Sequence, residues 1–159
     1  MIACSIRNHV WFITSVGLRI RLHLAPMMPS SFLQYCFSSP DDFAVSALTK
    51  YYEEHFKDGE DVLDICSSWV SHFPTDFKGG NVVGLGMNDY ELSQNKQIND
   101  YVVKDLNEDP VLPFDDESFD KVCCVVSVDY LNKPLQIFKE IGRVLRPGGE
   151  CILSMSNRW

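Results

Sequence analysis

VLDICSSWVSH (Val62–His72) joins a short apolar run to an acidic residue and then to a turn. Such a run is typical of a buried strand in a parallel sheet, and proteins with these sheets often bind a cofactor at the loop that follows. That loop commonly carries glycines, as in G-x-G-x-G, because glycine lets the backbone approach a ligand closely. Here the corresponding places hold Cys66, Ser68 and Val70. The stretch therefore reads either as a cofactor loop with unusual residues or as the relic of one.

Helix-like and strand-like segments alternate on both sides of this stretch. Apolar spacing predicts a helix over 41–56, capped by Asp41 or Asp42, a polar helix over 89–98, and a helix from 133 that stops at residues 146–149. Five short apolar runs predict strands within residues 61–66, 81–87, 101–105, 119–131 and 150–156. This alternation predicts an α/β fold, a doubly wound, Rossmann-like and mostly parallel sheet with helices on both faces.

Ligands bind such sheets outside the carboxyl ends of the strands. The working surface is therefore expected at residues 66–68, 86–89, 105–106 and 127–130.

Composition describes one ordinary domain with an uneven charge. The chain has 159 residues, of which 45% are hydrophobic and 23% charged. Residues 1–40 carry three arginines and no acid, whereas the rest carry all 22 Asp and Glu against the other 11 of the 14 Lys and Arg, a net charge of −11. Such an acidic body argues against direct nucleic-acid binding, because it repels phosphate.

The cysteines and histidines predict no metal site. Six cysteines contain no C-x-x-C pair, and the four histidines have no metal-ligand spacing with one another or with cysteine. Cysteines inside apolar runs behave as small hydrophobes, so a reducing compartment is the simpler interpretation.

Residues 1–40 form an apolar, basic segment, distinct from the body at 41–159. Two interpretations stay open: an organellar targeting peptide, for a chloroplast or a mitochondrion, or a segment of a cytoplasmic protein that is disordered or an atypical start not shared with relatives of the body. Arg19 and Arg21 interrupt the apolar run, which disfavours a secretory signal and a stable membrane insertion.

Two long stretches in the second half carry a family resemblance. They are DLNEDPVLPFDDESFDKVCCVVSVDYL (residues 105–131) and KPLQIFKEIGRVLRPGGECILSMSNR (residues 133–158). In this order they resemble class I S-adenosylmethionine-dependent methyltransferases, in particular the type 11 branch, whose pattern is L-P-F-x-D-x-S-F-D followed by E-x-x-R-V-L-K/R-P-G-G. The resemblance covers about residues 42–157.

The resemblance implies S-adenosylmethionine as cofactor and a small molecule as methyl acceptor, and it leaves the catalytic residues unknown. Asp64 matches the position that faces the amino-acid part of the cofactor, Asp105 the reader of the adenine amine, with the Leu106 N–H beside it, and Ser127 the place where chain and cofactor meet. From the residues alone, Asp105 could instead cap its loop, and Asp64 could brace one. The full set implied to bind the cofactor is Asp64, Cys66, Ser68, Gly86, Met87, Asn88, Asp105, Leu106 and Ser127.

Three departures from the family pattern stand out. The glycine loop is degenerate, and the second strand ends in Gly86 where the family has an acid for the ribose diol, so that Asn88 or Asp89 would have to substitute. The family sheet has seven strands, whereas this chain stops after the fifth. A domain truncated there is expected to have an incomplete C-terminal edge, and an open edge makes self-association plausible.

Three functional hypotheses follow. The leading one is a methyltransferase-like domain that acts on a small molecule, and the alternative is a non-catalytic interaction or scaffold domain of that fold. A nicotinamide-dependent oxidoreductase has little support, because no G-x-G-x-x-G follows the first strand. His72 could serve as a general base, but a lone histidine is more often a loop residue.

Overall fold

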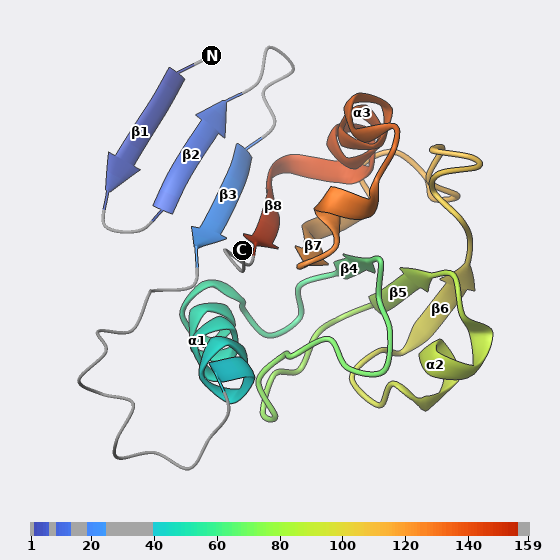
Figure 1. Ribbon diagram of the computed structural model, residues 1–159, viewed down its shortest axis with the longest axis horizontal. Helices are drawn as coiled ribbons and strands as arrows, with labels where there is room; N and C mark the ends of the chain where they lie inside the picture. Colours follow the sequence, from blue (N-terminus) through green and yellow to red (C-terminus); the bar gives the residue numbers. More distant parts are fainter. Residues whose placement is uncertain (1, 7–8, 14–18, 25–39, 156–159) are drawn as a thin grey trace.

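A computed structural model describes residues 2–6, 9–13, 19–24 and 40–155 and shows one eight-stranded sheet with helices packed on it (Figure 1). The strands are β1 (Ile2–Ile6), β2 (His9–Ile13), β3 (Arg19–Leu24), β4 (Val62–Ile65), β5 (Val82–Gly86), β6 (Asp100–Val103), β7 (Phe119–Val125) and β8 (Leu145–Met155). The helices are α1 (Pro40–His55), α2 (Asp89–Gln94), the 3-10 turn η1 (Val128–Tyr130) and α3 (Pro134–Val144).

The predicted doubly wound sheet is confirmed. The five strands of the body lie in the order β8-β7-β4-β5-β6, and all of them are parallel. Chain order therefore reverses between β4 and β7, which is the place where folds of this kind bind their ligands.

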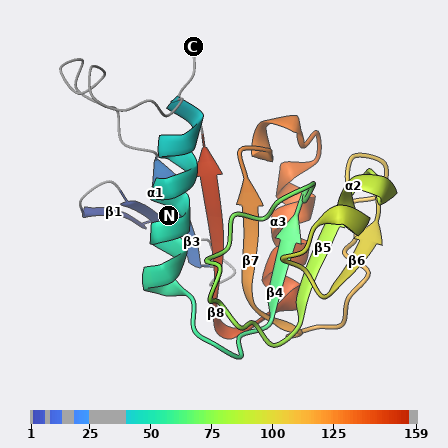
Figure 2. The ribbon, with the colours of Figure 1, turned by 90° about the horizontal axis from the view of Figure 1, so that it is seen from below.

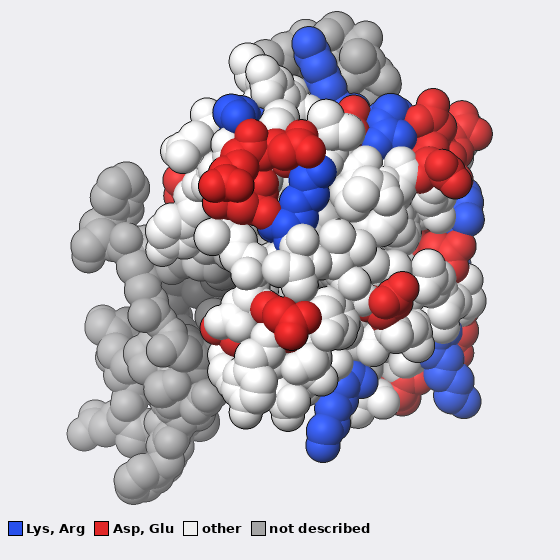
Figure 3. All heavy atoms as spheres, turned by 90° about the vertical axis from the view of Figure 1, so that its right-hand side faces the viewer, with Lys and Arg blue, Asp and Glu red and all other residues white. Residues whose placement is uncertain are grey.

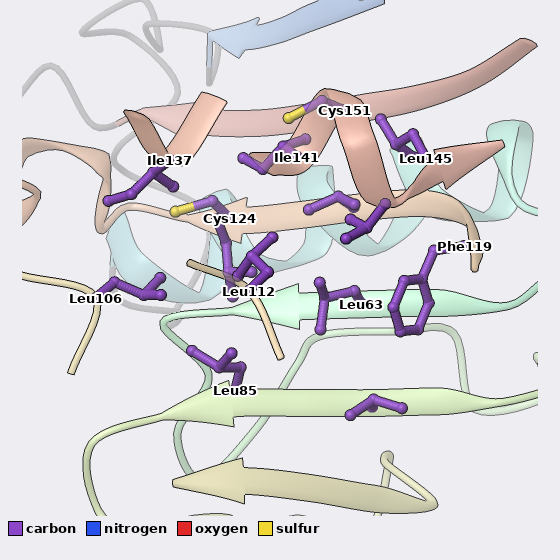
Figure 4. Packing of buried hydrophobic residues seen from close by; sticks show 14 of the residues in the cluster. Leu63, Leu85, Leu106, Leu112, Phe119, Cys124, Ile137, Ile141, Leu145 and Cys151 are labelled. Carbon is purple, nitrogen blue, oxygen red and sulfur yellow. The ribbon is translucent and has the colours of Figure 1, made fainter. Parts of the chain in front are cut away.

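Apolar residues line both faces of the central strands. In β4, Leu63 and Ile65 belong to one buried cluster and Val62 to the other, and in β7 Cys124 and Cys123 divide in the same way. Helix α3 covers the first cluster and α1 the second, on opposite faces of the sheet (Figures 1 and 2). Figure 4 shows side chains of the first cluster reaching from the strands toward α3.

Several helix boundaries differ from prediction. Helix α2, predicted over residues 89–98, ends at Gln94. Helix α1 begins at Pro40, so that Asp41 and Asp42 lie in its first turn rather than at its cap. Proline suits this first position because its missing N–H has no partner there in any helix. Helix α3 ends at Val144, and β8 begins at Leu145 without a separate loop.

Arg146 connects the amino ends of β4 and β7 through ion pairs. Arg146 pairs with Asp61 and Asp120 at 2.7 Å each, and Asp120 Oδ2 also accepts from the Asp61 N–H at 2.9 Å. Asp120 therefore anchors the start of strands and lies away from the ligand end of the sheet.

Arg143 clamps the long loop before β7. Its guanidinium donates to the carbonyl oxygens of Leu112 and Phe114, both at 2.8 Å, and pairs with Glu140 and Asp116 at 2.7 Å each. The family stretches E-x-x-R and L-P-F-x-D thus meet in one structural contact.

The C-terminal edge is incomplete, as predicted, but it is not open at the fifth strand. Strand β3 lies beside β8 in parallel register, with Arg19–Leu24 opposite Glu150–Met155, and β2 and β1 follow as antiparallel strands. The edge is filled because residues 19–24 supply the hydrogen-bonding partner for β8. The antiparallel pair that follows the fifth strand in the family does not occur within residues 40–155.

Candidate functional site

A pocket of about 370 Å³ opens at the carboxyl ends of β4, β5, β6 and β7, where chain order reverses. This volume falls within the range of ~300–1,000 Å³ that is usual for small-molecule sites. The pocket is lined by Cys66, Ser67, Ser68, Leu85, Gly86, Met87, Asn88, Glu91, Lys104, Asp105, Leu106, Asn107, Ser127, Tyr130 and Leu131.

The structure brings together eight of the nine residues that the sequence nominated. Those eight are Cys66, Ser68, Gly86, Met87, Asn88, Asp105, Leu106 and Ser127. Asp64 is the exception, since it does not line the pocket. The pocket is also lined by residues outside the predicted working surface: Leu85, Glu91, Lys104, Asn107 and Leu131.

Hydrogen bonds fix the loop after β4 in place of glycines. Cys66 has φ +57°, a conformation that glycine adopts easily and cysteine rarely. The Ser67 N–H donates to the Leu85 carbonyl at 2.9 Å, and Asn95 Nδ2 donates to the Ser68 carbonyl at 3.0 Å. The loop therefore keeps a defined path across the end of β5.

Gly86 has to be a glycine because of that path. A Cβ atom placed there would lie 2.3 Å from the Ser67 carbonyl oxygen, far inside a permitted contact. The loop backbone thus occupies the space into which a side chain at position 86 would point. The absent strand-end acid and the unusual loop are two consequences of one packing arrangement.

Asp64 braces the loop from below. Its side chain is only 3% exposed, and its Oδ2 accepts from Ser71 Oγ at 2.6 Å, while Asn95 Nδ2 donates to the same hydroxyl at 2.9 Å. Burial raises the pKa of Asp64 to about 6, although the hydrogen bond from Ser71 opposes the shift. Of the two interpretations of this carboxylate, the geometry favours the brace.

Asp105 both caps its loop and lines the pocket. Its Oδ1 accepts from the Asn107 N–H at 2.8 Å. Asn107 in turn connects this loop to the segment after β7, since its Nδ2 donates to the Tyr130 carbonyl at 3.0 Å and its Oδ1 accepts from the Asn132 N–H at 2.7 Å. These bonds join two walls of the pocket.

Glu91 reaches the pocket from the first turn of α2. Its Oε1 accepts from Asn88 Nδ2 at 2.9 Å, and its Oε2 makes a short hydrogen bond with Ser68 Oγ. In the sequence, an Asn followed three residues later by Glu indicates only a helix start, so no local signal pointed to a ligand.

Cys66 is the more accessible of two hydrogen-bonded cysteines, Cys66 and Cys124. It lines the pocket partly exposed, whereas Cys123, Cys124 and Cys151 are buried. A hydrogen bond with the Cys124 thiol lowers the pKa of Cys66, and the same contact, together with burial, raises the pKa of Cys124.

Among these four cysteines, Cys66 is therefore expected to react first with iodoacetamide near neutral pH, because thiolate character and access both favour it. Peptide mass spectrometry over time measures the order, and Cys124→Ala should slow the reaction at Cys66 by removing the hydrogen bond. Equal rates at Cys66 and Cys151 would contradict the prediction.

His72, the candidate general base, does not line this pocket, and burial lowers the pKa of His72. Within residues 44–155, whose side chains the structure describes, no group of three His, Cys, Asp or Glu side chains could hold a metal ion.

The family profile described as "Methyltransferase domain" matches residues 63–153, which run from β4 into β8 and include the whole pocket. The chain belongs to the methyltransferase-domain family. Solved structures with this fold include methyltransferases described as dependent on S-adenosylmethionine.

Similar proteins, both curated sequences and solved structures, include other methyltransferases. Sterol 24-C-methyltransferase from Pneumocystis carinii is 28% identical over 141 residues, covering 76% of this chain and 35% of that protein. The enzyme of the same name from Schizosaccharomyces pombe is 35% identical over 109 residues, covering 62% and 28%. A solved SAM-dependent methyltransferase from Thermotoga maritima has a TM-score of 0.56 at 20% identity, covering 70% of this chain and 51% of that one. The chain thus spans about a third of the length of these sterol methyltransferases.

The donors and acceptors of the pocket suit S-adenosylmethionine. Glu91 and Asp105 against Lys104 give the lining a net charge of −1, which complements a zwitterionic amino acid joined to a cationic sulfonium. Hydroxyl and amide groups for the polar parts lie among apolar side chains such as Leu85 and Leu106, which suit an adenine ring.

Proposed function

We propose that this chain binds S-adenosylmethionine in the described pocket and forms the cofactor-binding part of a methyltransferase that acts on a small apolar molecule. The observation that carries the proposal is the convergence of four strand ends of a methyltransferase domain on one pocket of suitable volume. In this fold the cofactor supplies an activated methyl group on sulfur, so the protein mainly positions the reactants and excludes water.

Each wall of the pocket has a role in this proposal. The Asp105 oxygen that is not used for the Asn107 N–H would accept from the adenine amine, with the Leu106 N–H donating to the ring. Cys66 and Ser68 would lie along the amino-acid part. Ser127, whose Oγ donates to the Val125 carbonyl at 2.8 Å, would shape the end of β7 near the sulfonium.

The pocket rim supports an apolar acceptor. Met87 and Tyr130 line the pocket while 67% and 74% exposed, and Trp69 and Tyr90 pack edge to face with ring centroids 5.5 Å apart beside the Ser68–Glu91 contact. Aromatic and apolar side chains at a rim suit an apolar surface more than a charged one. Two of the similar proteins, from Pneumocystis carinii and Schizosaccharomyces pombe, are named sterol 24-C-methyltransferases, and a sterol belongs to this class of acceptor.

Charge argues against a nucleic-acid acceptor. On the face that Figure 3 shows, acidic side chains lie in separate groups with Lys and Arg between them, so this face has no continuous basic patch. The body has a net charge of −11, which repels the phosphates of a nucleic acid.

None of the helices in the described part of the chain is both long enough and apolar enough to cross a membrane.

Calorimetric titration of the 159-residue chain with S-adenosylmethionine tests the proposal, with Asp105→Asn as the decisive variant. Asparagine keeps the Oδ1 acceptor for the Asn107 N–H but places an amide donor where the adenine amine needs an acceptor. Binding is expected to weaken about tenfold to a hundredfold, since a hydrogen bond to a charged group contributes ~1.5–3 kcal/mol.

Asp115→Asn is the matched control, because Asp115 is exposed and does not line the pocket. This variant should bind as the unaltered chain does. A folded chain that binds no cofactor would overturn the proposal and favour the non-catalytic scaffold.

A further inference from the structure

The chain lacks the acid that its family places at the end of the second strand of the body for the ribose diol. Position 86 cannot hold any side chain, because the Ser67 carbonyl lies 2.3 Å from where the Cβ would be. If the pocket holds S-adenosylmethionine as proposed, the ribose diol needs another acceptor.

Only two carboxylates line the pocket within the part of the chain whose side chains are described, Glu91 and Asp105. Asp105 follows β6 and is engaged with the Asn107 N–H. Glu91 lies in the first turn of α2, five residues after Gly86, the last residue of β5. Gly86 and Glu91 line the same pocket, so Glu91 is the carboxylate that follows the end of β5 there.

Two hydrogen bonds orient the Glu91 carboxylate. Asn88 Nδ2 donates to Oε1 at 2.9 Å, and Ser68 Oγ donates to Oε2. An ionised carboxylate has about four acceptor sites, so each oxygen can accept one further hydrogen bond. A sugar diol offers two hydroxyl donors on adjacent carbons, which matches two such acceptors on one carboxylate.

We infer that Glu91, positioned by Ser68 and Asn88, binds the ribose diol of the cofactor in place of the missing strand-end acid. The inference rests on the proposed function and assigns the diol to one side chain. It also explains why the loop after β4 differs from the glycine pattern of the family. The serine at position 68, where the family has a glycine, supplies a hydroxyl that holds the substitute carboxylate.

The test compares S-adenosylhomocysteine with its 2′,3′-dideoxy analogue by calorimetry on the full chain. The unaltered chain is expected to bind the analogue about tenfold to a hundredfold more weakly than the parent compound, because the analogue leaves the carboxylate without its partners. Glu91→Gln can still accept from Asn88 and contact Ser68 through its amide, so the loop is kept. It should weaken binding of the parent compound and reduce the difference between the two ligands to severalfold or less.

Glu54→Gln is the matched control, because Glu54 is exposed on α1 and does not line the pocket. Circular dichroism confirms that each variant is folded. Full discrimination between the two ligands by Glu91→Gln would overturn the inference while leaving the proposed function intact. No binding of S-adenosylhomocysteine by the unaltered chain would overturn both.

Discussion

Replacing Gly86 by alanine is expected to lower the free energy of unfolding by about 1–3 kcal/mol, because overpacking a well-filled site costs that much. The new Cβ would lie 2.3 Å from the Ser67 carbonyl oxygen, which is backbone and cannot rotate away. The loop would have to move, and the Ser67–Leu85 hydrogen bond of 2.9 Å would be strained with it. Ligand affinity should fall by at least tenfold, since Ser67 and Ser68 line the pocket. Urea denaturation and calorimetry measure the two effects.

Gly84→Ala is the matched control on the same strand. A Cβ there would meet Ile98 Cδ1 at 2.8 Å, the end of a flexible side chain that can turn aside. This variant should lose less stability and keep its ligand affinity. The explanation for Gly86 would be wrong if both variants behaved alike.

Replacing Asp64 by asparagine is expected to raise stability at neutral pH relative to the unaltered chain, and less so at low pH. Burial raises the pKa of Asp64 to about 6 from an ordinary 3.8, so the folded state keeps a proton that the unfolded chain has lost. The stability from this group is thus complete below about pH 4 and is lost as the pH rises through 6. A shift of this size corresponds to about 3 kcal/mol.

The quantity to measure is the difference in unfolding free energy between Asp64→Asn and the unaltered chain, from about pH 4 to pH 8. Carboxylates with lowered pKa values, such as Asp61 and Glu140, change stability in the opposite sense, but they cancel in this difference. Ser71→Ala serves as a second variant: it removes a hydrogen bond that lowers the pKa of Asp64, so the change should move to higher pH. A difference that is flat over this range would contradict the prediction.

The parallel sheet of the body is predictable because its signals are local. Strands β4 and β7 are short runs whose central residues are buried on both faces. Pro134 begins α3, and the sequence R-P-G-G at residues 146–149, which lies near the start of β8, indicates that the helical pattern has ended. The carboxyl ends of such strands meet at one edge, so the order of the strands is enough to place Cys66, Gly86 and Asp105 together.

Asp64 and Glu91 cannot be assigned in this way. Asp64 lies one residue before the end of β4 and Glu91 in the first turn of α2, and their roles depend on partners that neither position reveals. Asp64 is held by Ser71 and buried, while Glu91 is drawn to Ser68, which lies 23 residues away. Their positions depend on how the loop crosses β5, which no local pattern encodes.

The amino-terminal strands escape prediction for a different reason. Residues 19–24 read RIRLHL, a strict alternation of basic and apolar residues that is typical of a strand, but arginines in an acid-free segment equally suggest targeting. Their partner β8 lies at the other end of the sequence, and such long-range pairing leaves no trace in either segment alone.

The pairing of β3 with β8 also sets an order of events during synthesis. Residues 19–24 are made before every strand of the body, whereas their partners, residues 150–155, are made after the other strands. Residues 19–24 therefore have no sheet partner while the strands between residues 24 and 150 are made. For that interval their backbone donors and acceptors are open to water, to chaperones or to other nascent chains, and the sheet is completed only after residues 150–155 have emerged.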